Sequence, residues 1–342
     1  MNDPVPQSPT TPAGRELVLI SNPLSFTNAR SNGGIEALEQ QVKAIGGQCL
    51  RIDREHSPQQ AVAAALSAGG RLLIANGGDG TIQGVISAVL QQQPEGIGVA
   101  VLPGGRTNVI AADLGLSGAP HRLLPDLLNA WRGGRLPMAQ RHTLKVQIDQ
   151  QPPEYGFLLN GGGLAHFIED CWDFRERYRR WGLHGGLGTG SWVVGRLLAG
   201  LLGRRLFSPV QSPLYWQGEH WRDTLTAFSV TTNQHLPLGI SPYREDSDSP
   251  LKASAIAGEA RHVAWRLLVA MLANGRGLTP ERGFISGQPE SLTITAAQPL
   301  RYHLDGESHA METGQQLTVA LGPKIALYAP GAAVPTVTPA VE

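Results

Sequence analysis

Apolar and polar positions along the first part of the chain follow two alternating periodicities. β-Strands are predicted at residues 16–21 (ELVLIS), a short apolar run, and at residues 48–53. Buried strands are predicted at residues 71–75 (RLLIA) and 98–102 (GVAVL). Helices are predicted between them by apolar residues spaced three or four apart, near residues 32–45, 57–68, 82–92, 109–114 and 123–132. Repeated strand–helix units with near-continuous apolar strands indicate a parallel sheet covered by helices.

The pattern changes after about Leu136. Alternation and turn residues predict antiparallel strands at residues 143–148, 156–160, 224–232, 291–295, 300–304, 316–321 and 325–329. Helical spacing persists at residues 172–181, 192–202 and 262–273. We therefore expect an α/β domain over residues 15–135, a mainly β sandwich domain over residues 136–330, and disordered tails at residues 1–14 and 331–342.

Composition narrows the class of protein. The chain has 342 residues, which favours two domains, and 28 basic residues balance 28 acidic ones, which argues against nucleic-acid binding. Two cysteines, Cys49 and Cys171, form no disulfide framework, so a reducing cytoplasm is expected. The first 14 residues lack the basic cluster and apolar run of a signal peptide, and no apolar stretch is as long as a transmembrane helix.

Glycine is abundant, at 42 residues, and two glycine-rich loops each follow a predicted buried strand. They are Gly77-Gly78-Asp79-Gly80-Thr81 and Gly104-Gly105-Arg106-Thr107-Asn108. Ligands of parallel α/β sheets bind beyond the carboxyl ends of strands, and glycine lets backbone amides approach phosphate. Neither loop is a P-loop or a dinucleotide motif, and Asp79 has the alternative interpretation of a turn cap. A third glycine run at residues 185–190 follows no strand and is predicted to be a flexible turn.

The loops resemble the motifs of a known family. Gly77-Gly78-Asp79-Gly80-Thr81 matches the signature shared by diacylglycerol kinases, sphingosine kinases and related bacterial lipid kinases, with NAD kinases as distant relatives. Three further elements keep the family's order between about residues 16 and 330. Asn22-Pro23-x-Ser25 resembles N-P-x-S/A-G, Leu102–Asn108 resembles P-x-G-T-x-N, and Leu304-Asp305-Gly306-Glu307 resembles the D-G-E element.

The resemblance implies an active site between an α/β nucleotide domain and a β-sandwich domain. It also implies transfer of the γ-phosphate of ATP to a lipid hydroxyl, with Mg²⁺. Several positions depart from the family pattern, which makes the chain a divergent member. The departures are Gln83 and Gly84 after the first loop, Arg106 in place of Thr, Val109, Ala112, Ala165, Ser249 and Lys252.

Site residues follow from the resemblance. The residues expected to bind ATP are Asn22, Gly77, Gly78, Asp79, Gly80, Thr81, Gly104, Gly105, Arg106, Thr107 and Asn108. Asp79 would lie at the phosphates or their Mg²⁺, and Asp248 would remain from a metal-associated stretch. Arg106 would bind phosphate in place of the threonine, or face solvent.

Glu307 is expected to be the general base that accepts the proton of the lipid hydroxyl, with Asp305 orienting it or binding metal. Without the resemblance, the Asp305-Gly306 pair would be a simple hairpin turn.

The expected partners are ATP and a lipid acceptor, with no nucleic acid and with the oligomeric state left open. Residues 172–207 contain tryptophans, arginines and an apolar run. This segment either forms a helix that binds the inner face of the membrane or packs on the sandwich. Two other functions stay open: a nucleotide- or lipid-binding protein that has lost turnover, and a kinase of a soluble acceptor.

Overall fold

The computed structural model describes residues 16–31, 33–178, 185–201, 210–234, 243–244, 247–257 and 283–331. The chain divides into two compact units, one of residues Met1–Arg141 with Lys324–Glu342 and the other of residues His142–Pro323. Contiguous domains were expected from the sequence, whereas the end of the chain returns to the first unit because its last strand joins that sheet. Most residues of the expected tails, and the predicted helix at residues 262–273, lie outside the described residues.

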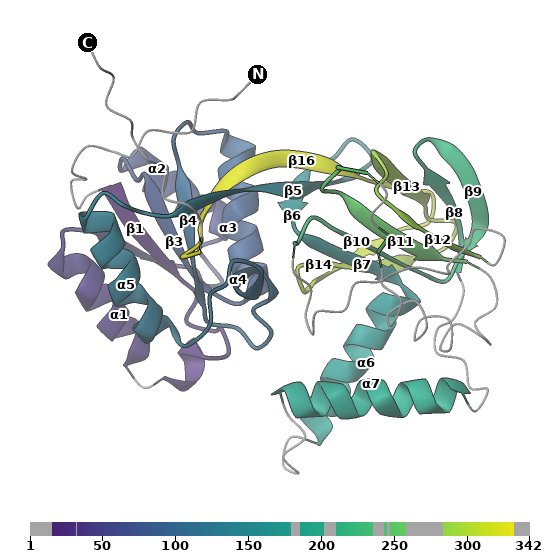
Figure 1. Ribbon diagram of the computed structural model, residues 1–342, viewed down its shortest axis with the longest axis horizontal. Coiled ribbons are helices and arrows are strands. Elements are labelled where there is room, and N and C mark those ends of the chain that lie inside the picture. Colours follow the sequence, from purple (N-terminus) through teal and green to yellow (C-terminus); the bar gives the residue numbers. More distant parts are fainter. Residues whose placement is uncertain are drawn as a thin grey trace. The chain divides into compact units, whose positions relative to one another are not determined.

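The first unit contains a parallel sheet (Figure 1). Its strands are, in spatial order, β2 (Gln48–Arg51), β1 (Leu17–Ser21), β3 (Leu72–Gly77), β4 (Gly98–Pro103) and the end of β16 (Gln316–Tyr328). All five residues of β1 and all six of β3 are buried, as expected for strands covered on both faces.

Helices cover this sheet. They are α1 (Gly34–Ala44), α2 (Pro58–Ser67), α3 (Asp79–Gln92), α4 (Val109–Asp113) and α5 (Pro120–Arg132). Helix α1 packs on α5, and α2 packs on α3. The start of α2 agrees with the sequence prediction: Ser57 Oγ accepts from the amide of Gln60, whose side chain accepts from the amide of Ser57, and Pro58 takes the first helical position.

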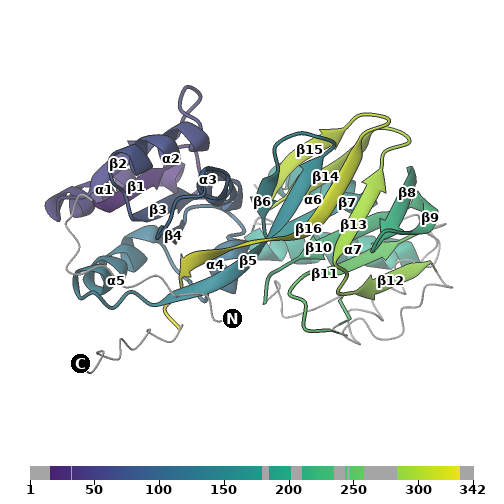
Figure 2. The ribbon, with the colours of Figure 1, turned by 90° about the horizontal axis from the view of Figure 1, so that it is seen from above.

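The second unit consists mainly of two antiparallel sheets that enclose one hydrophobic core (Figure 2). One sheet has the order β12 (Phe284–Gly287), β11 (Lys252–Ile256), β10 (Ala227–Thr231), β7 (Leu158–Gly162), β14 (Leu300–Leu304) and β15 (Glu307–Met311). The other pairs the start of β16 with β13 (Ser291–Thr295), then β8 (Val210–Trp216) and β9 (Glu219–Leu225), and adds β5 (Met138–Ile148) and β6 (Glu154–Gly156). The α/β fold followed by a mainly β domain is therefore confirmed.

Two strand predictions need correction. Residues 224–232 were expected to form one strand, but the chain passes from β9 in one sheet to β10 in the other at Thr226. Residues 316–321 and 325–329 were expected to be separate strands, but β16 continues through Gly322-Pro323-Lys324. A Cβ on Gly322 would lie 2.5 Å from Thr143 Oγ1, so the strand passes here where only glycine fits.

Two helices of the second unit, α6 (Gly163–Arg177) and α7 (Gly185–Leu201), pack on each other, and α6 also contacts β7, β10 and β14. The predicted flexible turn at residues 185–190 is wrong, because these residues form the first turns of α7. Gly188 is buried, and the neighbouring Thr189 side chain is hydrogen-bonded to Cys171 of α6. Tertiary packing therefore outweighs the low helix propensity of glycine. In the described part of the chain, no helix has both the length and the apolar character of a membrane span.

Candidate nucleotide and acceptor sites

The first glycine loop is a tight connection from β3 to α3. Strand β3 ends at Gly77 and α3 begins at Asp79, so the predicted loop residues Asp79, Gly80 and Thr81 form the first turn of the helix. A Cβ on Gly77 would lie 2.6 Å from the Cβ of Thr81, so only glycine fits there. The amides of this first turn have no carbonyl partners within the helix, which is the arrangement that binds phosphate.

The second glycine loop packs directly on the first. The amide of Gly104 donates a hydrogen bond of 2.7 Å to the carbonyl of Gly77. A Cβ on Gly105 would lie 2.6 Å from the Cα of Gly78, and one on Gly104 would lie 3.1 Å from the Cα of Gly77. These glycines are therefore needed for contact between the two loops, a requirement additional to the approach of a phosphate oxygen.

Asp79 joins the two loops through its carboxylate. Its Oδ1 accepts a hydrogen bond of 3.2 Å from the amide of Ile110, and the amides of Asn108 and Val109 also favour the charged carboxylate. Burial raises the pKa of Asp79 above its ordinary value, and these amides oppose the rise. The carboxylate therefore caps α4, the helix after the second loop.

Two asparagines expected at the phosphates use their side chains within the loops. Asn108, at φ 52°, accepts from the amide of Gly105 at 2.9 Å and donates to its carbonyl at 3.1 Å. Asn22 donates from Nδ2 to Thr81 Oγ1 at 2.9 Å, and its Oδ1 accepts from the amide of Leu24 at 2.9 Å. Both side chains therefore determine the shape of the loops.

Residues 25–28, after β1, complete this arrangement. Ser25 Oγ accepts from the amide of Gly78 at 3.2 Å, and the amide of Thr27 donates to the carbonyl of Gly104 at 2.8 Å. Asn28 is buried, and its side chain donates a hydrogen bond to the carbonyl of Asn22. Only Ser25 carried a signal in the sequence, as part of the N-P-x-S motif. Thr27 and Asn28 are recognised only through contacts that the fold creates.

The groups that remain exposed here fit a phosphate chain. Arg106 and Thr107 are exposed after Gly105, which packs on the start of α3. A helix N-terminus carries partial positive charge, and a guanidinium binds two phosphate oxygens at once. These residues suit a chain of linked phosphates.

The D-G-E element forms a turn in the second unit. Asp305 and Gly306 have φ values of 48° and 89° and connect β14 to β15 as a two-residue hairpin turn. The carboxylate of Asp305 is buried and accepts from the amides of Phe157 at 2.8 Å and Leu158 at 2.9 Å. Asp305 therefore fixes the turn to β7.

Glu307 is the first residue of β15 and is exposed. Within the described residues its side chain has no hydrogen bond or ion pair, in contrast to Asp305. The two carboxylates of the element therefore have different surroundings. Asp305 is hydrogen-bonded to backbone amides, and Glu307 is accessible to a ligand.

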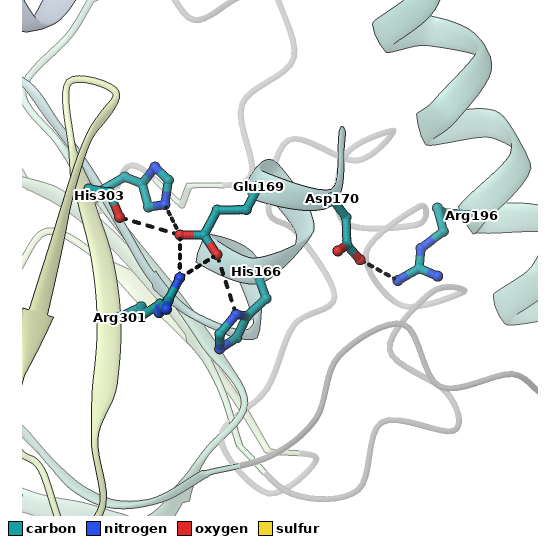
Figure 3. A network of polar contacts seen from close by, with 7 residues as sticks. His166, Glu169, Asp170, Arg196, Arg301 and His303 are labelled. Carbon is teal, nitrogen blue, oxygen red and sulfur yellow. Dashed lines mark hydrogen bonds and ion pairs between the residues drawn. The ribbon is translucent and has the colours of Figure 1, made fainter. Parts of the chain in front are cut away.

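A second polar network joins the same hairpin to α6 (Figure 3). The carboxylate of Glu169 lies 3.2 Å from Arg301 Nη1, 3.3 Å from His303 Nε2 and 3.3 Å from Ser308 Oγ. His303 is 1% exposed and also packs on the ring of Trp172, with centroids 5.0 Å apart.

Charge within this network is balanced by its own partners. Burial raises the pKa of Glu169, but Arg301 and His303 outweigh it and leave the pKa lowered. Burial also lowers the pKa of His303, with Glu169 opposing that change. No motif pointed to Glu169, because Arg301, His303 and Ser308 are more than 130 residues away in the sequence.

The predicted metal ligand Asp248 is exposed, between β10 and β11. Among the described residues, no three acidic, histidine or cysteine side chains are grouped as a cation site.

Comparison with known proteins bears on both units. Residues 16–133 match the sequence model of the diacylglycerol kinase catalytic domain. No curated protein matches the chain. A crystal structure of a candidate diacylglycerol kinase from Bacillus anthracis str. Sterne is similar in fold, with a TM-score of 0.61 and 14% identity over 93% of this chain and 98% of that one. A diacylglycerol kinase structure from the same organism gives 0.54 and 13% over 93% and 98%.

One departure from the diacylglycerol kinase pattern has a packing reason. A Cβ on Gly84 would lie 2.9 Å from Cγ of Pro58, at the contact between α3 and α2. A larger residue after the glycine loop would therefore push these helices apart. Gln83 beside it is buried in the same helix.

Proposed function

We propose that the protein is an ATP-dependent lipid kinase that transfers the γ-phosphate to a lipid hydroxyl. The carboxylate of Asp79 supports this most strongly, because it holds two glycine loops together at the first turn of α3 in a diacylglycerol kinase catalytic domain. We propose that the helix N-terminus and the exposed Arg106 contact one polyphosphate.

In this proposal the phosphates of ATP bind the amides of Gly80 and Thr81 and the guanidinium of Arg106. Mg²⁺ would arrive with the nucleotide and offset the charge of its phosphates. Asp79 then acts mainly by holding the loops, since backbone amides already surround its carboxylate. The asparagines at positions 22 and 108 keep the loops in register.

We assign the general base to Glu307. The acceptor oxygen attacks the γ-phosphorus, the bond from that phosphorus to the ADP oxygen breaks, and the hydroxyl proton passes to the Glu307 carboxylate. Its exposure and lack of described partners support this role, while Asp305 positions the turn. The metal assignment to Asp248 has no further support in the described residues.

The acceptor is proposed to come from the inner face of the membrane through α7. Val194 and Leu198, one helical turn apart, are 56% and 55% exposed. Trp192 packs on Phe174 at 5.1 Å between centroids, and Arg196 pairs with Asp170 at 3.3 Å, so these groups serve α6–α7 packing. The apolar pair on α7 remains for a lipid surface.

The test uses the full chain, ATP labelled on the γ-phosphate, and mixed micelles that contain diacylglycerol, a sphingoid base or phosphatidylglycerol. We expect label in at least one lipid, and its loss in Glu307→Gln but not in the matched variant Glu312→Gln, an exposed glutamate after β15. Label in no lipid would refute the proposed function. Equal activity of the two variants would refute the assignment of the base.

A further inference from the structure

Two departures from the family motifs touch each other in the first unit. Phe26 stands where the N-P-x-S/A-G element has glycine, and Arg106 stands where P-x-G-T has threonine. The guanidinium carbon of Arg106 lies 4.5 Å from the centroid of the Phe26 ring. The guanidinium carbon of Arg30 lies 3.7 Å from the same centroid. The aromatic replacement therefore contacts the arginine replacement and a second arginine, both within the 6 Å range of cation–π attraction.

The backbone on either side of Phe26 is fixed to the two glycine loops. Ser25 before it binds the amide of Gly78 in the first loop. Thr27 after it binds the carbonyl of Gly104 in the second loop. The ring is thus held at the junction of the loops, and the two guanidiniums on it share that position.

The charges point to the ligand. The two guanidinium carbons are at most about 8 Å apart, and both arginine side chains are exposed. An anion that contacts both guanidiniums is attracted by two positive charges at once. A polyphosphate can contact both guanidiniums, because each one binds two oxygens, and it offers the pair more oxygens and more negative charge than a monophosphate does.

We propose that Arg30 and Arg106 form a two-arginine clamp for the polyphosphate of a nucleoside triphosphate, with Phe26 as the positioning residue. The clamp rests on the proposed nucleotide site, and it adds Arg30 and Phe26 to that site. It also explains why the motif glycine and the motif threonine are replaced together. The ring of Phe26, in place of the glycine, orients the guanidinium of Arg106, which takes over the phosphate contact of the threonine. Threonine needs no such support.

The test measures equilibrium binding of ATP and AMP to the full chain by calorimetry, without lipid. We expect Arg30→Gln and Arg106→Gln each to weaken ATP binding about 10-fold or more, the effect of losing one charge-assisted contact. AMP binding should change less than about 3-fold. The matched control is Arg135→Gln, which removes an exposed arginine of the same unit after α5 and should leave both affinities unchanged.

Phe26→Leu keeps an apolar side chain and removes the ring face. We expect it to weaken ATP binding and to reduce the additional effect of Arg106→Gln, so that the double variant binds ATP more tightly than the product of the two single effects predicts. Circular dichroism and the midpoint of thermal unfolding establish that each variant is folded.

Two results would overturn the clamp. One is an Arg30→Gln affinity for ATP equal to that of Arg135→Gln. The other is an equal loss of ATP and AMP binding in Arg30→Gln. The binding measurement contains no lipid, so it is independent of the phosphorylation assay. If ATP binding depends on Arg30 but no lipid is phosphorylated, the clamp is supported and the proposed function is refuted. Lipid phosphorylation without dependence on Arg30 would do the reverse.

Discussion

Removal of the Asp79 carboxylate tests how the two glycine loops are joined. In Asp79→Ala the amide of Ile110 loses its acceptor, and the amides of Asn108 and Val109 lose the charge they face. Asp79→Asn keeps an oxygen that can accept a hydrogen bond. The two substitutions therefore separate loss of the cap from loss of the charge.

The size of the effect follows from the cap. Removing an N-cap side chain costs about 0.5–2 kcal/mol, and leaving a buried amide without a partner costs about 1–3 kcal/mol. We therefore expect Asp79→Ala to lower the free energy of unfolding by about 1–3 kcal/mol. For a domain of this size, each kcal/mol lowers the unfolding midpoint by about 2–4 °C. Asp79→Asn should lose about 1 kcal/mol or less.

The pH dependence has a defined sign. Since burial raises the pKa of Asp79 in the folded state, its contribution to stability is fully present below the ordinary pKa of aspartate, about 3.9. That contribution is lost as the pH rises through the folded-state pKa. The free energy of unfolding of Asp79→Asn should lack this change. As the pH rises, Asp79→Asn should therefore become more stable relative to the parent.

Calorimetric and urea unfolding at several pH values measure these quantities, with Asp126→Ala as the control. Asp126 is an exposed aspartate on α5 of the same unit. The reasoning is refuted if Asp79→Ala loses no more stability than Asp126→Ala. It is also refuted if the difference between Asp79→Asn and the parent does not depend on pH.

Three other predictions concern packing, charge and the acceptor surface. Gly105→Ala should weaken ATP binding at least 10-fold in a titration, because its Cβ would lie 2.6 Å from the Cα of Gly78; an unchanged affinity would show that the loops separate freely. The pKa of Glu169 is lowered in the folded state, so the stability that its charged carboxylate contributes is lost in acid. In urea unfolding, the parent should therefore lose stability relative to Glu169→Gln as the pH falls below about 4.3, and parallel pH profiles would contradict this. Leu198→Asp should float less with anionic vesicles than Leu24→Asp, whose parent side chain is 69% exposed in the first unit; equal flotation would exclude α7 as the membrane contact.

Local signals in the sequence were sufficient for much of the fold. The start of α2 could be predicted because Ser57, Pro58 and Gln60 form their contacts within four residues. Strands β1, β3 and β4 of the first sheet, and β13 and β14, could be predicted because their apolar patterns match their burial. The course of β16 could not, since its two halves pair with different partners, β13 and β4.

The sequence was sufficient to locate the candidate site residues, but not to predict which groups their side chains contact. The glycine loops and the D-G-E turn were located by motif, yet the roles of Asp79 and Asp305 depend on amides 31 and about 148 residues away. Phe26 and Arg106 are separate substitutions in the sequence and become one feature only in the fold. Long-range contacts of this kind leave no periodicity in one sequence.

Comparison of Glu307→Gln with Glu312→Gln, in both lipid phosphorylation rate and ATP affinity, tests the central claim most directly. Loss of the carboxylate base should lower the rate at least 100-fold, as general base catalysis contributes about 10²–10⁴, while ATP affinity stays within about 3-fold of the parent. Glu312→Gln should match the parent in both measurements. A Glu307→Gln chain that phosphorylates lipid at the parent's rate would contradict the account.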